Sequence, residues 1–165
     1  MAGLDRTPRP QRLKGLDARI RRELPHIGPR ELRDLARSVE RLVEALEPEA
    51  IYVFGSHARG TPHADSDIDL LVLVNSSDKP PYRRAQDAYA IVGPHSVALD
   101  LQVMTRAEFE ARLPAVASLP ATVAREGRTL YAARSPDYLP VLQSNLRPAK
   151  LSPYGSTALD GNNPA

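Results

Sequence analysis

Three aspartates stand in or beside apolar runs of this sequence. Asp67 and Asp69 lie two residues apart at the start of the apolar run 68–74, so on a strand both side chains point to the same face. Two like charges that close repel each other, and a protein keeps both ionised when a cation lies between them. Because both ligands are oxygens, the sequence predicts a hard ion such as Mg²⁺ or Mn²⁺.

Asp100 is the third carboxylate, and it interrupts the otherwise apolar run 96–104. The run alternates, which predicts a strand with Asp100 on its polar face. An unpaired carboxylate is costly there if it is buried. Beside Asp67 and Asp69 it would complete a cluster able to hold two ions, which could clamp the attacking and leaving oxygens of an in-line displacement.

The run 50–54, AIYVF, ends at Gly55-Ser56. Glycine allows a sharp turn and a close approach to a ligand, and Ser56 offers a hydroxyl and a backbone N–H to a phosphate near a helix N-terminus. Arg59 adds a charge that can make bidentate contacts with phosphate oxygens. These residues are the candidate phosphate ligands.

Each of these features alone has an ordinary explanation. A Gly-Ser pair is usually a loop, and an Asp-x-Asp pair is usually a solvated strand edge. Their occurrence together, in order and at the ends of expected strands, favours metal and phosphate chemistry. His57 and His63 lie nearby, but they have no partner at a zinc-like spacing, so the carboxylates are the preferred ligands.

The stretch GSHARGTPHADSDIDLLVLV resembles the signature of minimal nucleotidyltransferases (MNT-type) of the DNA polymerase β superfamily. The later VALDLQVMT resembles the strand of that family that carries its third carboxylate, and AREGRTLY resembles its common ending. The resemblance covers about residues 30–132. It implies the nucleotidyltransferase fold and transfer of a nucleoside monophosphate from ATP or another NTP to a hydroxyl, with release of pyrophosphate.

The resemblance also assigns roles to the acidic residues. Asp67 and Asp69 would bind two Mg²⁺ ions, with Mn²⁺ as a possible substitute. Asp100 would bind the catalytic ion and help to deprotonate the attacking hydroxyl. Most of the catalysis would then come from positioning and charge neutralisation.

For the nucleotide, the resemblance implies that Gly55 and Ser56 hold the triphosphate and that Arg59 assists at the phosphates. The best-known acceptor in the family is a tyrosine of a HEPN-type toxin, which an MNT antitoxin modifies by AMPylation. Three alternatives stay open: transfer to the acceptor end of tRNA, transfer to a small molecule such as an aminoglycoside, and neutralisation of a partner by binding alone. The sequence does not identify the preferred nucleotide.

The elements that must position these residues follow from apolar periodicity. A stripe at spacings of three and four predicts a helix from Pro29 to about Pro48. Three strands are expected over 50–54, 68–74 and 96–104, helices over 82–92, 105–113 and 115–126, and a short closing strand over 129–132. This order predicts an α+β (α/β-type) fold: a small mixed sheet with helices mainly on one face.

The termini differ from the middle of the chain in composition. Residues 1–22 hold seven basic and two acidic residues, and we expect residues 1–27 to form a basic arm, partly disordered or a short helix, that could contact RNA. Residues 28–133 would be the nucleotidyltransferase domain, and 134–165 a proline-rich flexible tail. The chain has no cysteine, apolar membrane span or secretory signal, so we expect a cytoplasmic protein without a membrane partner.

Overall fold

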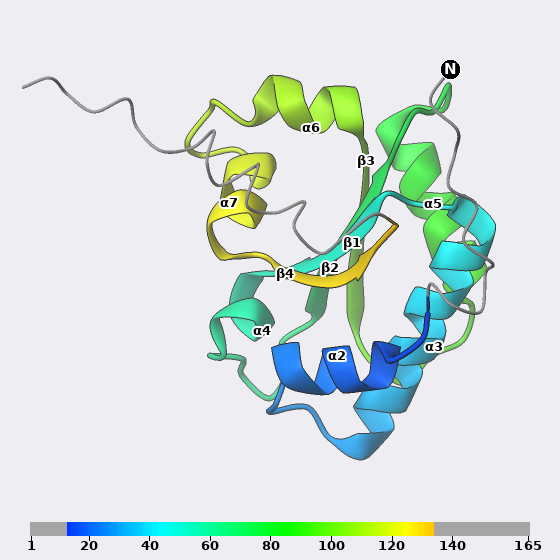
Figure 1. Ribbon diagram of the computed structural model, residues 1–165, viewed down its shortest axis with the longest axis vertical. Coiled ribbons are helices and arrows are strands. Elements are labelled where there is room, and N and C mark those ends of the chain that lie inside the picture. Colours follow the sequence, from blue (N-terminus) through cyan, green and yellow to red (C-terminus); the bar gives the residue numbers. More distant parts are fainter. Residues whose placement is uncertain (1–12, 134–165) are drawn as a thin grey trace, which may run out of the picture.

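The computed structural model describes residues 13–133 (Figure 1). The first 12 residues of the expected arm and the whole expected tail, 134–165, lie outside this range. The described residues form the five helices and four strands that the sequence predicts, and one further short helix after the first strand. In chain order they are α2 (Leu16–Glu23), α3 (Pro29–Leu46), β1 (Ala50–Phe54), α4 (Gly55–Arg59), β2 (Ile68–Val74), α5 (Pro81–Val92), β3 (Leu99–Thr105), α6 (Arg106–Arg112), α7 (Leu119–Glu126) and β4 (Arg128–Ala132).

The four strands form one mixed sheet in the order β3-β2-β1-β4. β1 runs antiparallel to both of its neighbours, β2 and β4. β2 and β3 are parallel, and α5 is the helix in the crossover that a parallel pair requires. The predicted mixed α/β sheet is therefore confirmed, and the expected closing strand is its fourth member.

Helices cover both faces of the sheet (Figure 1). The larger layer contains α2, α3 and α5, which pack on the face formed by residues such as Ile51, Leu70 and Leu101. α6 and α7 pack on the opposite face, against residues such as Tyr52 and Leu71. The second layer explains why β2 is a continuous apolar run: its side chains are buried on both sides.

Several element boundaries differ from those expected. β3 begins at Leu99 instead of residue 96, and α7 begins at Leu119 instead of residue 115. The later start of α7 has a local cause, since Ser118 Oγ accepts a hydrogen bond from the Ala121 N–H, 3.2 Å away, and caps the helix there. α4 occupies a stretch that the sequence analysis treats as a turn.

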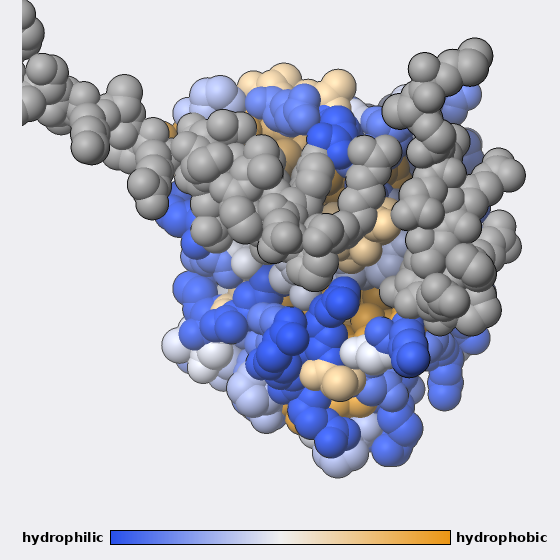
Figure 2. Space-filling model, in the orientation of Figure 1, coloured by the Kyte–Doolittle hydropathy of each residue, from blue (hydrophilic) through white to orange (hydrophobic). Residues whose placement is uncertain are grey.

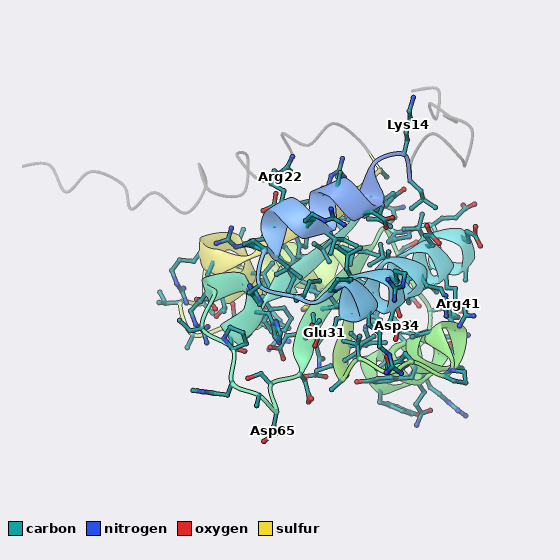
Figure 3. All side chains as sticks on the ribbon, turned by 90° about the horizontal axis from the view of Figure 1, so that it is seen from below. Lys14, Arg22, Glu31, Asp34, Arg41 and Asp65 are labelled. Carbon is teal, nitrogen blue, oxygen red and sulfur yellow. The ribbon has the colours of Figure 1, made fainter. Side chains whose placement is uncertain are left out.

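The short helix expected within the basic arm, residues 1–27, is α2, and it belongs to the packed structure. Leu16, Ile20 and Leu24 are buried in the same core as α3 and the sheet. Arg22 of α2 and Lys14, which precedes the helix, project away from the sheet (Figure 3), whereas Arg19 Nη1 donates to the Leu130 carbonyl of β4 at 3.4 Å. Hydrophilic side chains gather over this part of the surface (Figure 2). No helix in the described range 13–133 is long and apolar enough to cross a bilayer.

An ion pair joins the two helical layers around β3. Arg84 of α5 is 5% exposed and binds Glu108 of α6 through two hydrogen bonds, of 2.8 and 2.6 Å. The Glu108 carboxylate also accepts from the Thr105 N–H at 2.9 Å, which completes the capping box of α6. The hydrogen bonds from Arg84 are the largest cause that lowers the pKa of Glu108 to about 2.

Candidate active site

Asp69 and Asp100 are direct neighbours across the parallel strands β2 and β3. Phe54, the last residue of β1, lies opposite Asp69 on the other side. Because directly opposed residues share a face, the two carboxylates project from the same side of the sheet. The strand order needed to bring Asp100 beside Asp69 is therefore the order that the structure has.

The carboxylates mark the point where the apolar face of the sheet becomes polar. On this face, further along the strands, Leu71, Leu73 and Met104 are buried beneath α6 and α7. Asp69 and Asp100 lie at the end of that face, and both are half-buried. The site therefore has an apolar, packed floor on one side and access to solvent on the other.

Gly55 lies against the Asp69 carboxylate. Its φ is +69°, a conformation that L side chains rarely adopt. A Cβ at this position would lie 3.1 Å from Asp69 Cγ. Its distance to Asp69 Oδ2 would be shorter than the distances that Cβ atoms keep from other atoms in real proteins. Glycine is thus required twice here, by the backbone conformation and by the carboxylate beside it. Sequence reasoning expected this close approach to be toward a ligand.

Gly55 also begins α4, which lies beside β1, β2 and α7. Ser56 is half-buried in the first turn of this short helix. At its end, Arg128 Nε of β4 donates to the Ala58 carbonyl at 2.6 Å. Arg59 Nη1 pairs with Glu126 Oε1 of α7 at 2.7 Å. Contacts with β4 and α7 thus hold the short helix that begins with Gly55 and Ser56, the two candidate phosphate ligands of the turn.

The pKa of Asp69 is raised above its ordinary value. Desolvation by burial is the largest cause, and the negative charges of Asp100 and then Asp67 add to it. The positive charges of His57 and Arg59 act in the opposite direction. Asp100 and Asp67 are therefore each close enough to affect Asp69, and Arg59 also affects it while paired with Glu126.

Asp67 differs from the other two because it is exposed and precedes β2. The loop before it contains Asp65, which projects away from the body of the molecule (Figure 3). Within residues 13–133, no three or more Asp, Glu or His side chains are already arranged to hold a metal ion. A three-ligand metal centre thus stays a prediction that requires Asp67 to join Asp69 and Asp100.

Two histidines, His26 and His57, lie next to this loop. His57 of α4 is buried, and its Nε2 lies 3.2 Å from the Ser66 carbonyl, one residue before Asp67. His57 Nδ1 lies 3.0 Å from Nε2 of His26, in the α2–α3 connection. In a neutral His57 that donates from Nε2 to the Ser66 carbonyl, Nδ1 is an acceptor and His26 donates to it; in a protonated His57, Nδ1 donates to His26 instead. The pair thus joins three segments, and 31 residues separate its members.

The donor set fits a divalent cation of the oxygen-binding kind. Asp69 and Asp100 supply carboxylates from adjacent strand positions. Asp67 supplies a third negative charge, which contributes to the raised pKa of Asp69. Burial, and then the negative charges of Asp100 and Asp67, raise the pKa of Asp69, and a bound cation would favour the ionised form. Hard ions such as Mg²⁺ and Mn²⁺ prefer such ligands.

A family model supplies the class of this fold and site. The model of the nucleotidyltransferase domain matches residues 32–123, more than half of the chain. The chain therefore belongs to the nucleotidyltransferase domain family, and its enzyme class is nucleotidyl transfer. The matched range runs from α3 to α7 and contains all three aspartates and the Gly55-Ser56 turn.

Solved structures similar to this chain include two toxin–antitoxin complexes. One contains AMP-PNP and matches with a TM-score of 0.43 and 22% identity, over 66% of this chain and 80% of that chain. The other is a mutant of the toxin–antitoxin MntA–HpeT, with a TM-score of 0.43 and 19% identity, over 65% and 78% of the two chains. A Sulfolobus solfataricus protein provisionally named a nucleotidyltransferase has a TM-score of 0.46 and 17% identity, over 79% and 94%. No curated protein matches the chain. The family assignment depends on the family model and not on these structures.

Proposed function

We propose that this chain transfers a nucleoside monophosphate from an NTP to a hydroxyl acceptor in a reaction that requires a divalent metal, with Mg²⁺ as the natural ion. The observation that carries the proposal is the pairing of Asp69 with Asp100 across β2 and β3. Gly55 lies against the first of these carboxylates. This arrangement, in a member of the nucleotidyltransferase family, supports metal-dependent transfer.

The proposed roles follow from where each side chain lies. Asp67 and Asp69 would hold both ions, and Asp100 would hold the catalytic ion and take part in removing the acceptor proton. A bound metal would neutralise charge on the NTP phosphates and orient them. Asp100 projects from the same face as Asp69 at the solvent-accessible end of the sheet, so an acceptor hydroxyl can approach it from solution.

The proposed phosphate ligands belong to α4. Gly55 provides close approach because it has no side chain, and Ser56 provides a hydroxyl in the first turn. Arg59 would assist at the phosphates. Its partner Glu126 is itself partly exposed, and the pair lies at the surface, where such ion pairs contribute little stability. Arg59 can therefore exchange Glu126 for phosphate oxygens at low cost.

For the acceptor, we propose a protein hydroxyl, a tyrosine of a HEPN-type toxin, on the basis of the motif resemblance. The test is incubation of the protein with Mg²⁺, each of the four α-labelled NTPs, and a candidate toxin or tRNA. Label on the toxin, lost when EDTA is added and in Asp69→Asn, supports the proposal. Absence of label under every condition, with toxin binding unaffected by Asp67→Ala, would instead support a partner-binding protein without catalysis.

RNA is the second candidate acceptor because α2 has an exposed basic side. Arg21 and Arg22 are exposed on α2 and Lys14 is exposed just before it, whereas Asp17 is the exposed acidic residue of the helix and Glu23 pairs with Arg22. A row of cations can neutralise backbone phosphates, and the affinity would then fall steeply with salt. Label on tRNA rather than on protein in the same assay would identify this acceptor, and charge reversal at Arg21 should then lower the transfer.

A further inference from the structure

β3 is an edge strand of the sheet that residues 13–133 form, so within this range one side of its backbone has no neighbouring strand. The Ala98 carbonyl accepts from the Ile68 N–H of β2 at 2.8 Å. Peptide groups alternate in direction along a strand, so Asp100 has its own N–H and C=O toward β2. The Leu99 carbonyl and the Leu101 N–H point to the free edge. Such groups need another partner when a helix covers the edge.

The hydroxyl of Tyr89 is that partner. It donates to the Leu99 carbonyl at 3.2 Å and accepts from the Leu101 N–H at 3.0 Å. One hydroxyl has a donor and acceptor lone pairs, so it can make both bonds at once. α5 holds Tyr89 in place because Ala88 and Val92, on either side of it in the helix, are buried in the core.

These two bonds fall on the two peptide units that flank the Cα atom of Asp100. The Leu99 carbonyl belongs to the unit before Asp100, and the Leu101 N–H belongs to the unit after it. The orientation of these two units sets φ and ψ of Asp100, and hence the direction of its Cα–Cβ bond. β2 fixes the two units from one side, and the Tyr89 hydroxyl fixes them from the other.

We propose that Tyr89 is a positioning residue for Asp100: its hydroxyl takes the place of a missing strand and fixes the backbone that aims the third carboxylate at the metal. The inference rests on the proposed function, in which Asp100 is a metal ligand. Side chains that support a metal ligand typically change metal affinity 10- to 100-fold when they are removed. Tyr89 acts through the backbone, so we expect an effect near the lower end of that range.

Tyr89→Phe removes the hydroxyl and keeps the ring. Tyr82→Phe is the matched control, because Tyr82 lies on the same helix, is 64% exposed, and is more exposed than Tyr89 at 39%. Three quantities are compared on the full chain: thermal unfolding, hydrogen exchange of the Leu101 amide by NMR, and Mn²⁺ affinity by calorimetry with a non-hydrolysable ATP analogue present.

We expect Tyr89→Phe to stay folded, to exchange its Leu101 amide roughly 10-fold faster, and to bind Mn²⁺ about 10-fold more weakly. Tyr82→Phe should match the wild type in all three. In an Asp100→Asn background, Tyr89→Phe should cause no further loss of Mn²⁺ affinity, since the two residues act through one ligand. A purely structural role would lower the unfolding temperature without this dependence on Asp100.

The outcomes separate the inference from the function on which it rests. If wild-type protein binds Mn²⁺ and Tyr89→Phe binds it equally well, Tyr89 does not position Asp100, and the inference is overturned while the proposed function stands. If wild-type protein does not bind Mn²⁺ with the nucleotide analogue, the proposed function and the inference are both overturned. The inference is also overturned if Tyr89→Phe weakens Mn²⁺ binding but leaves the exchange rate of the Leu101 amide unchanged. Tyr89 would then not act on Asp100 through the backbone of β3.

Discussion

Replacing Gly55 with alanine adds one methyl group where α4 begins beside the Asp69 carboxylate. A Cβ there would lie 3.1 Å from Asp69 Cγ and would overlap Asp69 Oδ2. The carboxylate must move by about 1 Å to restore ordinary contact, and a misplacement of that size in a catalytic group costs on the order of 100-fold in rate. The residue also has φ +69°, which costs a non-glycine residue about 1–2 kcal/mol of stability.

The control for Gly55→Ala is Gly60→Ala, at the other end of α4. Gly60 has φ +73°, so alanine costs a similar 1–2 kcal/mol there. A Cβ at Gly60 would meet nothing within 4 Å. The two variants therefore share the backbone penalty, and only Gly55→Ala displaces the carboxylate.

The assay measures the rate of nucleotidyl transfer at saturating NTP and Mg²⁺, together with the free energy of unfolding in urea. We expect both variants to lose similar stability and only Gly55→Ala to lose about 100-fold in kcat. If the two variants retain the same kcat, the close approach of Gly55 to the Asp69 carboxylate does not matter for catalysis.

Three further predictions concern the ionisable groups. Arg84→Met should lower the free energy of unfolding in urea by about 1–3 kcal/mol. This loss lies between the values for a surface and a buried ion pair because Glu108 is partly exposed. Because the pKa of Glu108 is lower in the folded protein, its carboxylate stabilises the fold at pH values above 4.5, the pKa in the unfolded chain. This stabilisation is lost as the pH falls toward about 2. An unchanged acid transition in Arg84→Met would contradict this assignment. The pKa of His26 is lowered, by burial first and then by His57, so the unfolded state takes up this proton more readily and stability should fall as the pH drops below 6.5. His26→Ala should flatten that slope in thermal unfolding scans, and a slope equal to that of the wild type would exclude His26 as its source. Asp69→Asn should abolish metal-dependent transfer with an unchanged circular dichroism spectrum, because it removes a ligand and a repulsive charge together; retained turnover would refute the assigned role.

Local sequence patterns predicted most elements of this fold and the two faces of β3. Strict alternation after Val97 separated the buried side of β3 from the side that carries Asp100, and the structure confirms that division. Ranges such as 50–54 and 68–74 coincide with β1 and β2 because short apolar runs end there at glycine or polar residues. The pairing of Asp69 with Asp100 needed the parallel register of two strands, which no local pattern encodes.

What the sequence did not predict depends on contacts between distant segments. α4 has five residues, too few for a helical period to be recognised. Arg59 pairs with Glu126, 67 residues away, and Tyr89 reaches the edge of β3 through a hydroxyl whose target is backbone. Periodicity identifies which face of an element is buried, but it carries no information on which side chain lies opposite across a fold.

The central claim is that Asp69 and Asp100, with Asp67, hold divalent metal for nucleotidyl transfer. Its most direct test is anomalous diffraction from crystals grown with Mn²⁺ and a non-hydrolysable NTP. We predict an anomalous peak between the carboxylates of Asp69 and Asp100, with the triphosphate beside Gly55-Ser56. Manganese bound elsewhere on the protein, or nucleotide bound with no peak between these two aspartates, would contradict the account.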